Sequence, residues 1–263
     1  MQKPTRRQFI LGALGAAALA GLTAWVKRNS LIGWAVRRTS NDALNLTAAP
    51  RVTSDLCVLT AAQPEGPFFI PAPERSDLRE DRVGKELELQ LQLVHAPHCA
   101  PIEGAVVEIW QCDAEGVYSG YPEDIAHDLW RTFRLVGRDA QPVPPVNEKR
   151  FLRGAQVSDA QGKVSFSTIF PGWHEPRAPH LHFKIFTADR VELTSQFYFD
   201  PAFCDLIYRT YEPYTRHGPC PFTPQNDVVL HDYQHATGLL LRPAWNDDGP
   251  LEISAKIGLP RPR

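Results

Sequence analysis

The strongest constraint on the fold is a ten-residue segment, Lys85–Val94, with the sequence KELELQLQLV. From Glu86 to Leu93 every polar residue is followed by a leucine, so the period is two. Successive side chains of a β-strand point to opposite faces, whereas a helix would spread these leucines around its surface. The segment is therefore predicted to be a strand with one buried face and one exposed face.

Other segments have the length and composition of short strands, and the 24 prolines of the chain disfavour long helices. The turn-forming residues Asp159–Gly162 indicate a hairpin between Val157-Ser158 and Lys163–Ile169. A short helix is expected within Pro201–Tyr211. The sequence thus predicts an all-β fold, a β-sandwich of short, mostly antiparallel strands with long functional loops. The remaining predicted strands are Gly104–Gln111, His180–Thr187 and Thr194–Phe199.

The first 28 residues have the pattern of a targeting segment. Paired arginines, Arg6-Arg7, precede an apolar run from Phe9 to Val26 that is rich in Ala and Gly. This layout is typical of twin-arginine signal peptides, and an uncleaved membrane anchor is the alternative. We expect export to the periplasm or beyond, with membrane contact only through residues 1–28. Residues 29–54 are expected to be a linker, and residues 55–263 the folded domain.

Charge and cysteine content limit the remaining possibilities. Five of the 28 basic residues lie in residues 1–28, so the rest of the chain carries 23 basic against 30 acidic residues. This acidic balance gives no reason to expect nucleic-acid binding. The five cysteines would in part form disulfides after export. Cys204 and Cys220 are the first pair expected, from their proximity in sequence, and the odd number leaves at least one thiol or an intermolecular bridge. Cys57, Cys99 and Cys112 complete the set.

A histidine pair is the clearest candidate for chemistry. His180 and His182 stand two positions apart on a predicted strand and should point to the same face, as a two-point metal clamp. Two surface histidines on an edge strand are the alternative. The preceding loop offers His174 as a further ligand and Arg177 as a positive charge. Tyr118, on a loop after another strand, could be a phenolate ligand or could cover the core.

These segments together resemble the intradiol ring-cleavage dioxygenase family, which includes catechol 1,2-dioxygenase and protocatechuate 3,4-dioxygenase. One family block matches Pro101–Ala105, Trp110 and Gly116–Tyr118, and a second matches Pro171–His174 and Arg177–His182. Glu65–Phe69 resembles the entry segment of the family. The resemblance covers roughly residues 55–200 and is closest to the exported, single-domain branch.

The resemblance implies a non-haem Fe(III) held by two tyrosinates and two histidines. The implied ligands are Tyr118, His180 and His182, but the position of the second tyrosine holds His174. Imidazole can bind a metal and accept a proton, although it brings no negative charge. The resemblance further implies that Arg177 stabilises negative charge on the substrate and that Gln196 lies in the active site. The implied reaction opens a small catechol-type aromatic diol with O2 to a muconate-type diacid.

Other functions remain open at this point. The change at His174 is compatible with a family member that has lost or altered its activity. A zinc hydrolase would use His174, His180 and His182 with an open water position. A non-enzymatic binding module on a sandwich fold would leave the pattern of histidines, Tyr118 and Arg177 unexplained. The loop 122–150 and the tyrosine-rich segment 208–214 are expected to shape the substrate pocket. The oligomeric state cannot be inferred from sequence.

Overall fold

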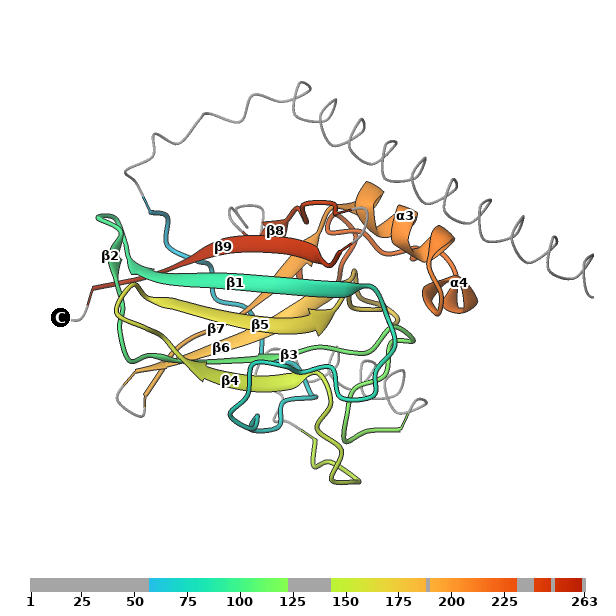
Figure 1. Cartoon of the computed structure of the whole chain (residues 1–263), viewed down its shortest axis with the longest axis horizontal. Coiled ribbons are helices and arrows are strands. Elements are labelled where there is room, and N and C mark those ends of the chain that lie inside the picture. The colour runs from blue at the N-terminus through green and yellow to red at the C-terminus, as the bar shows by residue number, and fades with distance from the viewer. Residues whose placement is uncertain (1–56, 123–142, 188–189, 231–238, 247–248, 262–263) are drawn as a thin grey trace, which may run out of the picture. The chain divides into compact units, whose positions relative to one another are not determined.

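A computed structural model describes residues 57–122, 143–187, 190–230, 239–246 and 249–261 (Figure 1). Every strand and helix among them belongs to one compact unit, formed by residues 51–244 and 249–263. The signal segment, residues 1–28, and the linker, residues 29–54, lie outside the described residues, so both stay predictions. Within the described ranges, no helix is long and apolar enough to cross a membrane.

Two sheets make up this unit, which confirms the predicted all-β, sandwich-like fold (Figure 1). In the smaller sheet β1 pairs antiparallel with β5 and parallel with β9, and β2 extends the end of β1. The larger sheet has the order β4-β3-β6-β7-β8. The strands of the smaller sheet are β1 (Glu86–His95), β2 (Ala100–Pro101), β5 (Lys163–Ile169) and β9 (Leu251–Leu259). Those of the larger sheet are β3 (Val106–Trp110), β4 (Arg153–Val157), β6 (His180–Thr187), β7 (Arg190–Phe199) and β8 (Leu240–Leu241).

Alternation along the strands creates the core. The four leucines of β1 are at most 1% exposed, as the period of two predicts. The central strands of the larger sheet contribute buried apolar residues at alternate positions as well. These residues are Val107 and Ile109 of β3, Leu181, Phe183 and Ile185 of β6, and Phe197 of β7.

The opposite face of the larger sheet is lined by polar and aromatic side chains. Arg153 of β4 lies opposite Trp110 of β3, which lies opposite His182 of β6, which lies opposite Gln196 of β7. Directly opposed residues share a face of the sheet, so these four side chains form one row. His180 and its partner Tyr198 form the next row on the same face. All six side chains are buried.

Two details differ from the sequence predictions. The turn at Asp159–Gly162 forms, with Gly162 at φ +73°, but it joins β4 of one sheet to β5 of the other and is not a hairpin. Turn chemistry specifies a local reversal and does not specify which strands will pair.

The disulfide is the second difference. It joins Cys57 to Cys99, whereas Cys112, Cys204 and Cys220 are thiols, so the expected Cys204–Cys220 pair is wrong. Pairing depends on a short Cα–Cα distance, here 5.3 Å across 42 residues of sequence, and proximity in sequence does not determine it.

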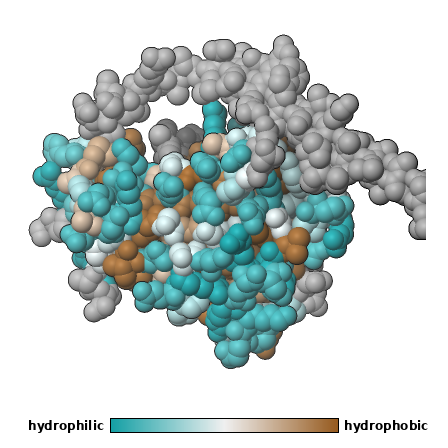
Figure 2. Space-filling view, viewed as in Figure 1, coloured by the Kyte–Doolittle hydropathy of each residue, from teal (hydrophilic) through white to brown (hydrophobic). Residues whose placement is uncertain are grey.

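The predicted helix is confirmed as α3 (Pro201–Thr210), and a short helix α4 (Tyr214–His217) follows it. Asp200 caps α3 by accepting hydrogen bonds from the backbone N–H groups of Ala202 and Phe203. On the face of the molecule seen in Figure 2, hydrophilic residues predominate. Exposed large apolar side chains occur at only seven described positions, a normal feature of protein surfaces.

Candidate metal centre

Three side chains converge on the polar face of the larger sheet. Tyr118 Oη lies 3.1 Å from His180 Nε2, and His180 Nε2 lies 3.0 Å from His182 Nε2. The two histidines come from one strand, and Tyr118 comes from the loop after β3. All three residues are at most 2% exposed. The structure therefore brings together three of the four ligands expected from the sequence.

Neighbouring groups orient these three side chains. His180 Nδ1 lies 2.7 Å from the carbonyl oxygen of Ala178, so a proton on Nδ1 leaves a lone pair on Nε2. The ring of His182 stacks on Trp110, with 4.8 Å between centroids and 8° between planes. The ring of Tyr118 stacks on Phe68 at 4.7 Å. The side chains of the three candidate metal ligands are thus held in place by aromatic packing and one backbone carbonyl.

Burial sets the protonation of the cluster. Burial, reinforced by the charge of Arg177, lowers the pKa of His180 and His182 well below the usual value, so both rings are neutral. Burial also raises the pKa of Tyr118 well above its usual value. Neutral imidazoles are the form that binds metal, and a bound cation would favour the phenolate. The donor set therefore fits a metal ion.

His174 lies beside the converging atoms. Its ring centroid is 5.3 Å from that of His180 and 5.5 Å from that of Tyr118, and the residue is 5% exposed. Among the described residues, no group of three or more His, Cys, Asp or Glu side chains is arranged to hold a metal. The third side chain that meets His180 and His182 is Tyr118, and the zinc hydrolase alternative is not tested by this geometry.

The loops carrying Tyr118 and His174 pack backbone against backbone. A Cβ atom on Gly172 would lie 2.5 Å from the carbonyl oxygen of Asp113, and one on Gly116 would lie 2.3 Å from that of Trp173. Gly116 also has φ +86°, a conformation that favours glycine. Two glycines thus allow the close approach that brings Tyr118 and His174 together.

Two tyrosines of the segment 208–214 hold the backbone that precedes His174. The Tyr208 hydroxyl donates to the carbonyl oxygen of Pro171 at 2.9 Å, and that of Tyr214 donates to Phe170 O at 2.6 Å. Both side chains are buried, so they anchor the backbone before His174. Neither tyrosine lines the cavity of about 540 Å³ beside the Tyr118 loop, and the expected role of the segment in shaping a substrate pocket stays a prediction.

Arg177 lies at the centre of a buried hydrogen-bond network and is 0% exposed. Its Nε donates to Asp227 Oδ2 at 2.8 Å, and its Nη2 donates to Gln196 Oε1 at 2.5 Å and to Tyr198 Oη at 2.9 Å. Its Nη1 lies 3.5 Å from His180 Nε2. Burial acts to lower the pKa of Arg177, but Asp227 together with Tyr198 and Tyr118 outweighs burial, so the net shift of the pKa is upward. A permanent positive charge therefore adjoins the converging donors.

Sequence reasoning placed Arg177 and Gln196 in the site but missed two of their partners. One is Tyr198, whose hydroxyl bonds within the Arg177 network. The hydroxyl of Tyr121, another tyrosine near Tyr118, donates to Val143 O at 2.5 Å. Asp227 was not identified, because it lies 50 residues from Arg177 and no local pattern marks it.

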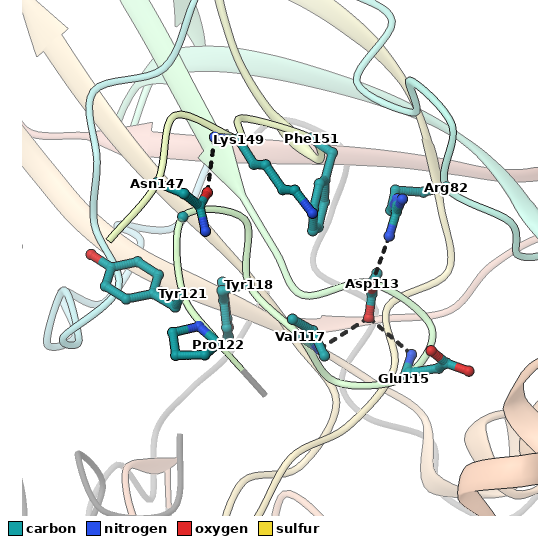
Figure 3. Close-up of a pocket in the computed structure, with 11 residues that line it drawn as sticks. Arg82, Asp113, Glu115, Val117, Tyr118, Tyr121, Pro122, Asn147, Lys149 and Phe151 are labelled. Atoms are coloured by element: carbon teal, nitrogen blue, oxygen red, sulfur yellow. Dashed lines mark hydrogen bonds and ion pairs between the residues drawn. The ribbon is translucent and has the colours of Figure 1, made fainter. Parts of the chain in front are cut away.

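A pocket of about 540 Å³ lies beside the Tyr118 loop (Figure 3). Tyr118 is the one converging donor that lines it. Around it are charges of both signs, and Arg82 and Asp113 form an ion pair of 3.5 Å across its wall. Part of the wall, Asn147, Lys149 and Phe151, comes from the end of the connection 122–150 that was expected to shape a pocket. Residues 123–142 of that connection lie outside the described residues.

Comparison with known proteins shows consistent similarities. A family model described as Dioxygenase (Dioxygenase_C) matches residues 65–216. The structure of an intradiol ring-cleavage dioxygenase from Tetranychus urticae is similar with a TM-score of 0.67 and 30% identity, covering 78% of this chain and 95% of that one. The dioxygenase domain of a carbohydrate-binding fusion protein from Streptomyces shares the fold, with a TM-score of 0.50 and 23% identity over 77% and 99%.

A curated relative gives a shorter match. The chlorocatechol 1,2-dioxygenase of Cupriavidus pinatubonensis is 30% identical over 150 residues, which is 52% of this chain and 53% of the relative. The chain spans about half the length, or less, of the curated relatives it matches first.

Proposed function

Because this chain belongs to the intradiol ring-cleavage dioxygenase family, we propose that it is a non-haem iron enzyme that opens a small catechol-type substrate with O2. Cleavage would occur between the two hydroxyl-bearing carbons and give a muconate-type diacid. The partners are the aromatic diol and O2.

The observation that carries this proposal is the convergence of three side chains in a buried site, where His180 Nε2 lies 3.1 Å from Tyr118 Oη and 3.0 Å from His182 Nε2. Members of the family typically use non-haem Fe(III). One phenolate and neutral imidazoles suit iron, and Tyr118, His180 and His182 would hold it, with His174 as the fourth ligand. When bound, ferric iron would supply Lewis-acid chemistry that activates the catechol for reaction with O2.

The surrounding side chains would act on the substrate directly. The imidazole of His174 would accept a proton from a catechol hydroxyl, the part played by the second tyrosine elsewhere in the family. The guanidinium of Arg177, fixed in a site from which water is excluded, would stabilise negative charge that develops on the substrate. Gln196 accepts from Arg177 and donates to Pro64 O at 2.8 Å, so it holds the guanidinium against the strand.

The substitution His174→Tyr tests this ligand set. A second phenolate near the iron should strengthen the visible phenolate-to-iron absorption band at equal iron content. The spectrum of the iron-loaded variant, compared with that of the wild type, measures the effect, and O2 uptake on adding catechol shows whether the parent protein turns over.

Trp173→Tyr is the matched control. It places a phenol one residue earlier, where the parent side chain packs on His217 at 4.3 Å and donates to Gly218 O. This variant should leave the band unchanged. If His174→Tyr binds iron and absorbs light no differently from the parent, His174 is not a ligand. Iron binding without O2 uptake in the parent protein would favour a family member with altered activity.

A further inference from the structure

One carboxylate outside the matched family segment accepts hydrogen bonds from four donors of the described residues. Asp227 Oδ2 accepts from Arg177 Nε and from the backbone N–H of Ala178, each at 2.8 Å. Asp227 Oδ1 accepts from the backbone N–H groups of Val229 and Leu230 at 2.8 and 2.9 Å. The carboxylate is 0% exposed. It therefore joins the turn at 227–230 to the loop that carries Arg177.

These contacts determine how the guanidinium of Arg177 is oriented. A guanidinium is planar and rigid, so fixing its Nε and Nη2 also fixes the direction of Nη1. Asp227 holds Nε, and Gln196 with Tyr198 holds Nη2. The remaining nitrogen, Nη1, then faces His180 at 3.5 Å. Without Asp227 the guanidinium would lose its partner at Nε, one of the two positions that fix its direction.

The bond to Ala178 extends the same control to the backbone. Ala178 supplies the carbonyl oxygen that lies 2.7 Å from His180 Nδ1. Asp227 therefore binds the backbone N–H of the same residue whose carbonyl oxygen orients His180. At its other end, Val229 packs in the cluster that contains Tyr118, Trp110 and Phe68. The turn at 227–230 is thus in contact with the wall of the site and with its charged residue.

We propose that Asp227 is a positioning residue for the reaction, one that orients Arg177 toward the substrate and does not itself touch it. This inference rests on the proposed function. Asp227 lies beyond residue 216, where the family match ends, and is argued from its contacts alone. A buried ion pair is a weak source of stability compared with apolar packing, which favours an orienting role.

Asp227→Asn is the direct test. The amide keeps an acceptor for the turn but places N–H donors against the N–H groups of Arg177 and Ala178. We expect kcat with catechol to fall roughly 10- to 100-fold, with KM changing much less, because a displaced guanidinium costs transition-state stabilisation. In the metal-free protein, NMR should show the slowly exchanging Nε–H resonance of Arg177, assigned by its loss in Arg177→Lys, disappear in Asp227→Asn.

Asp200→Asn is the matched control, because Asp200 caps α3 with the same two-bond pattern and has no contact with Arg177. It should change neither readout. If Asp227→Asn does not fold, Asp227→Ser replaces it, since a hydroxyl can still cap the turn.

Unchanged kcat with a retained Nε–H resonance in the folded Asp227 variant would overturn the inference. The two readouts separate this inference from the proposed function. If the wild type does not turn over catechol, the proposed function is overturned, whereas loss of the Nε–H resonance in Asp227→Asn still supports the orienting contact.

Discussion

At the residue scale, the candidate site is a set of polar side chains on one face of the larger sheet. This face is opposite the one that forms the apolar core, and its side chains are buried. Such a face leaves some groups imperfectly paired. Glu108, two positions before Trp110 on β3, has one carboxylate oxygen that is buried and without a hydrogen-bond partner among the described residues. Burial raises the pKa of Glu108, and the nearby charge of Lys184 offsets this only in part. The ionised carboxylate of Glu108 is therefore expected to lower the stability of the folded protein.

The substitution Glu108→Gln should raise the melting temperature at pH 7. The raised pKa means that the folded state keeps the Glu108 proton to higher pH than the unfolded chain. Stability from this group is therefore greatest below its unfolded pKa, about 4.3, and is lost as pH rises through the folded pKa. The advantage of the variant should thus disappear below about pH 4. Thermal unfolding of both proteins across pH measures it.

Glu252→Gln on the exposed face of β9 serves as the control and should have no effect at either pH. An equal gain from both substitutions, or a loss of stability in Glu108→Gln at pH 7, would contradict this explanation.

At the element scale, two loops and one strand build the candidate metal centre. The strand β6 supplies both histidines through its period of two, which is why the sequence predicts them. The loops meet only because Gly116 and Gly172 permit backbone contact. Both glycines belong to the matched family blocks, Gly116–Tyr118 and Pro171–His174, and their missing side chains let the loops of Tyr118 and His174 touch.

Gly172→Ala should therefore push the loops apart. The added Cβ would lie 2.5 Å from Asp113 O and 2.6 Å from Ala114 O, both backbone atoms that cannot turn aside. We expect a loss of about 1–3 kcal/mol in the free energy of unfolding and weaker iron binding. Denaturant unfolding and iron titration of the same samples measure the two effects.

The control for this prediction is Gly104→Ala, where φ is +74° and no atom lies within 4 Å of the added Cβ. It should lower stability through backbone strain and leave iron affinity unchanged. Parent-like iron affinity in a folded Gly172→Ala variant would show that loop contact does not set the geometry of the site.

At the scale of the whole molecule, the sequence predicted the layers and most of the site but not the long-range pairings. Alternation in β1 and the spacing of His180 and His182 are local patterns. The buried leucine face of β1 and the side-by-side histidines of β6, which these patterns predict, are both confirmed. The partner of Arg177 and the bridge between Cys57 and Cys99 depend on where distant segments meet. Local sequence patterns carry no information about which distant segments come into contact. Asp227 was therefore not predicted, and the disulfide was predicted wrongly.

The disulfide gives a direct test of the overall arrangement. Reduction of the Cys57–Cys99 bridge, which spans 42 residues, should cost about 4 kcal/mol through the added entropy of the unfolded chain. Denaturant unfolding with and without reductant measures this loss. The double variant Cys57→Ser/Cys99→Ser should be insensitive to reductant.

The double variant Cys204→Ser/Cys220→Ser should keep the full sensitivity of the wild type, because both residues are thiols in the structure. If this second variant became insensitive instead, the pairing expected from sequence would be correct.

The most direct test of the proposed chemistry is a turnover experiment with isotopic oxygen. Purified protein, with its iron content measured, is supplied with catechol and 18O2, and the product is analysed by mass spectrometry. The proposal predicts about one iron per chain, one O2 consumed per catechol, and a muconate-type diacid that contains both 18O atoms, with His182→Gln inactive. Protein that holds zinc, or that holds iron but neither consumes O2 nor opens the ring, would contradict it.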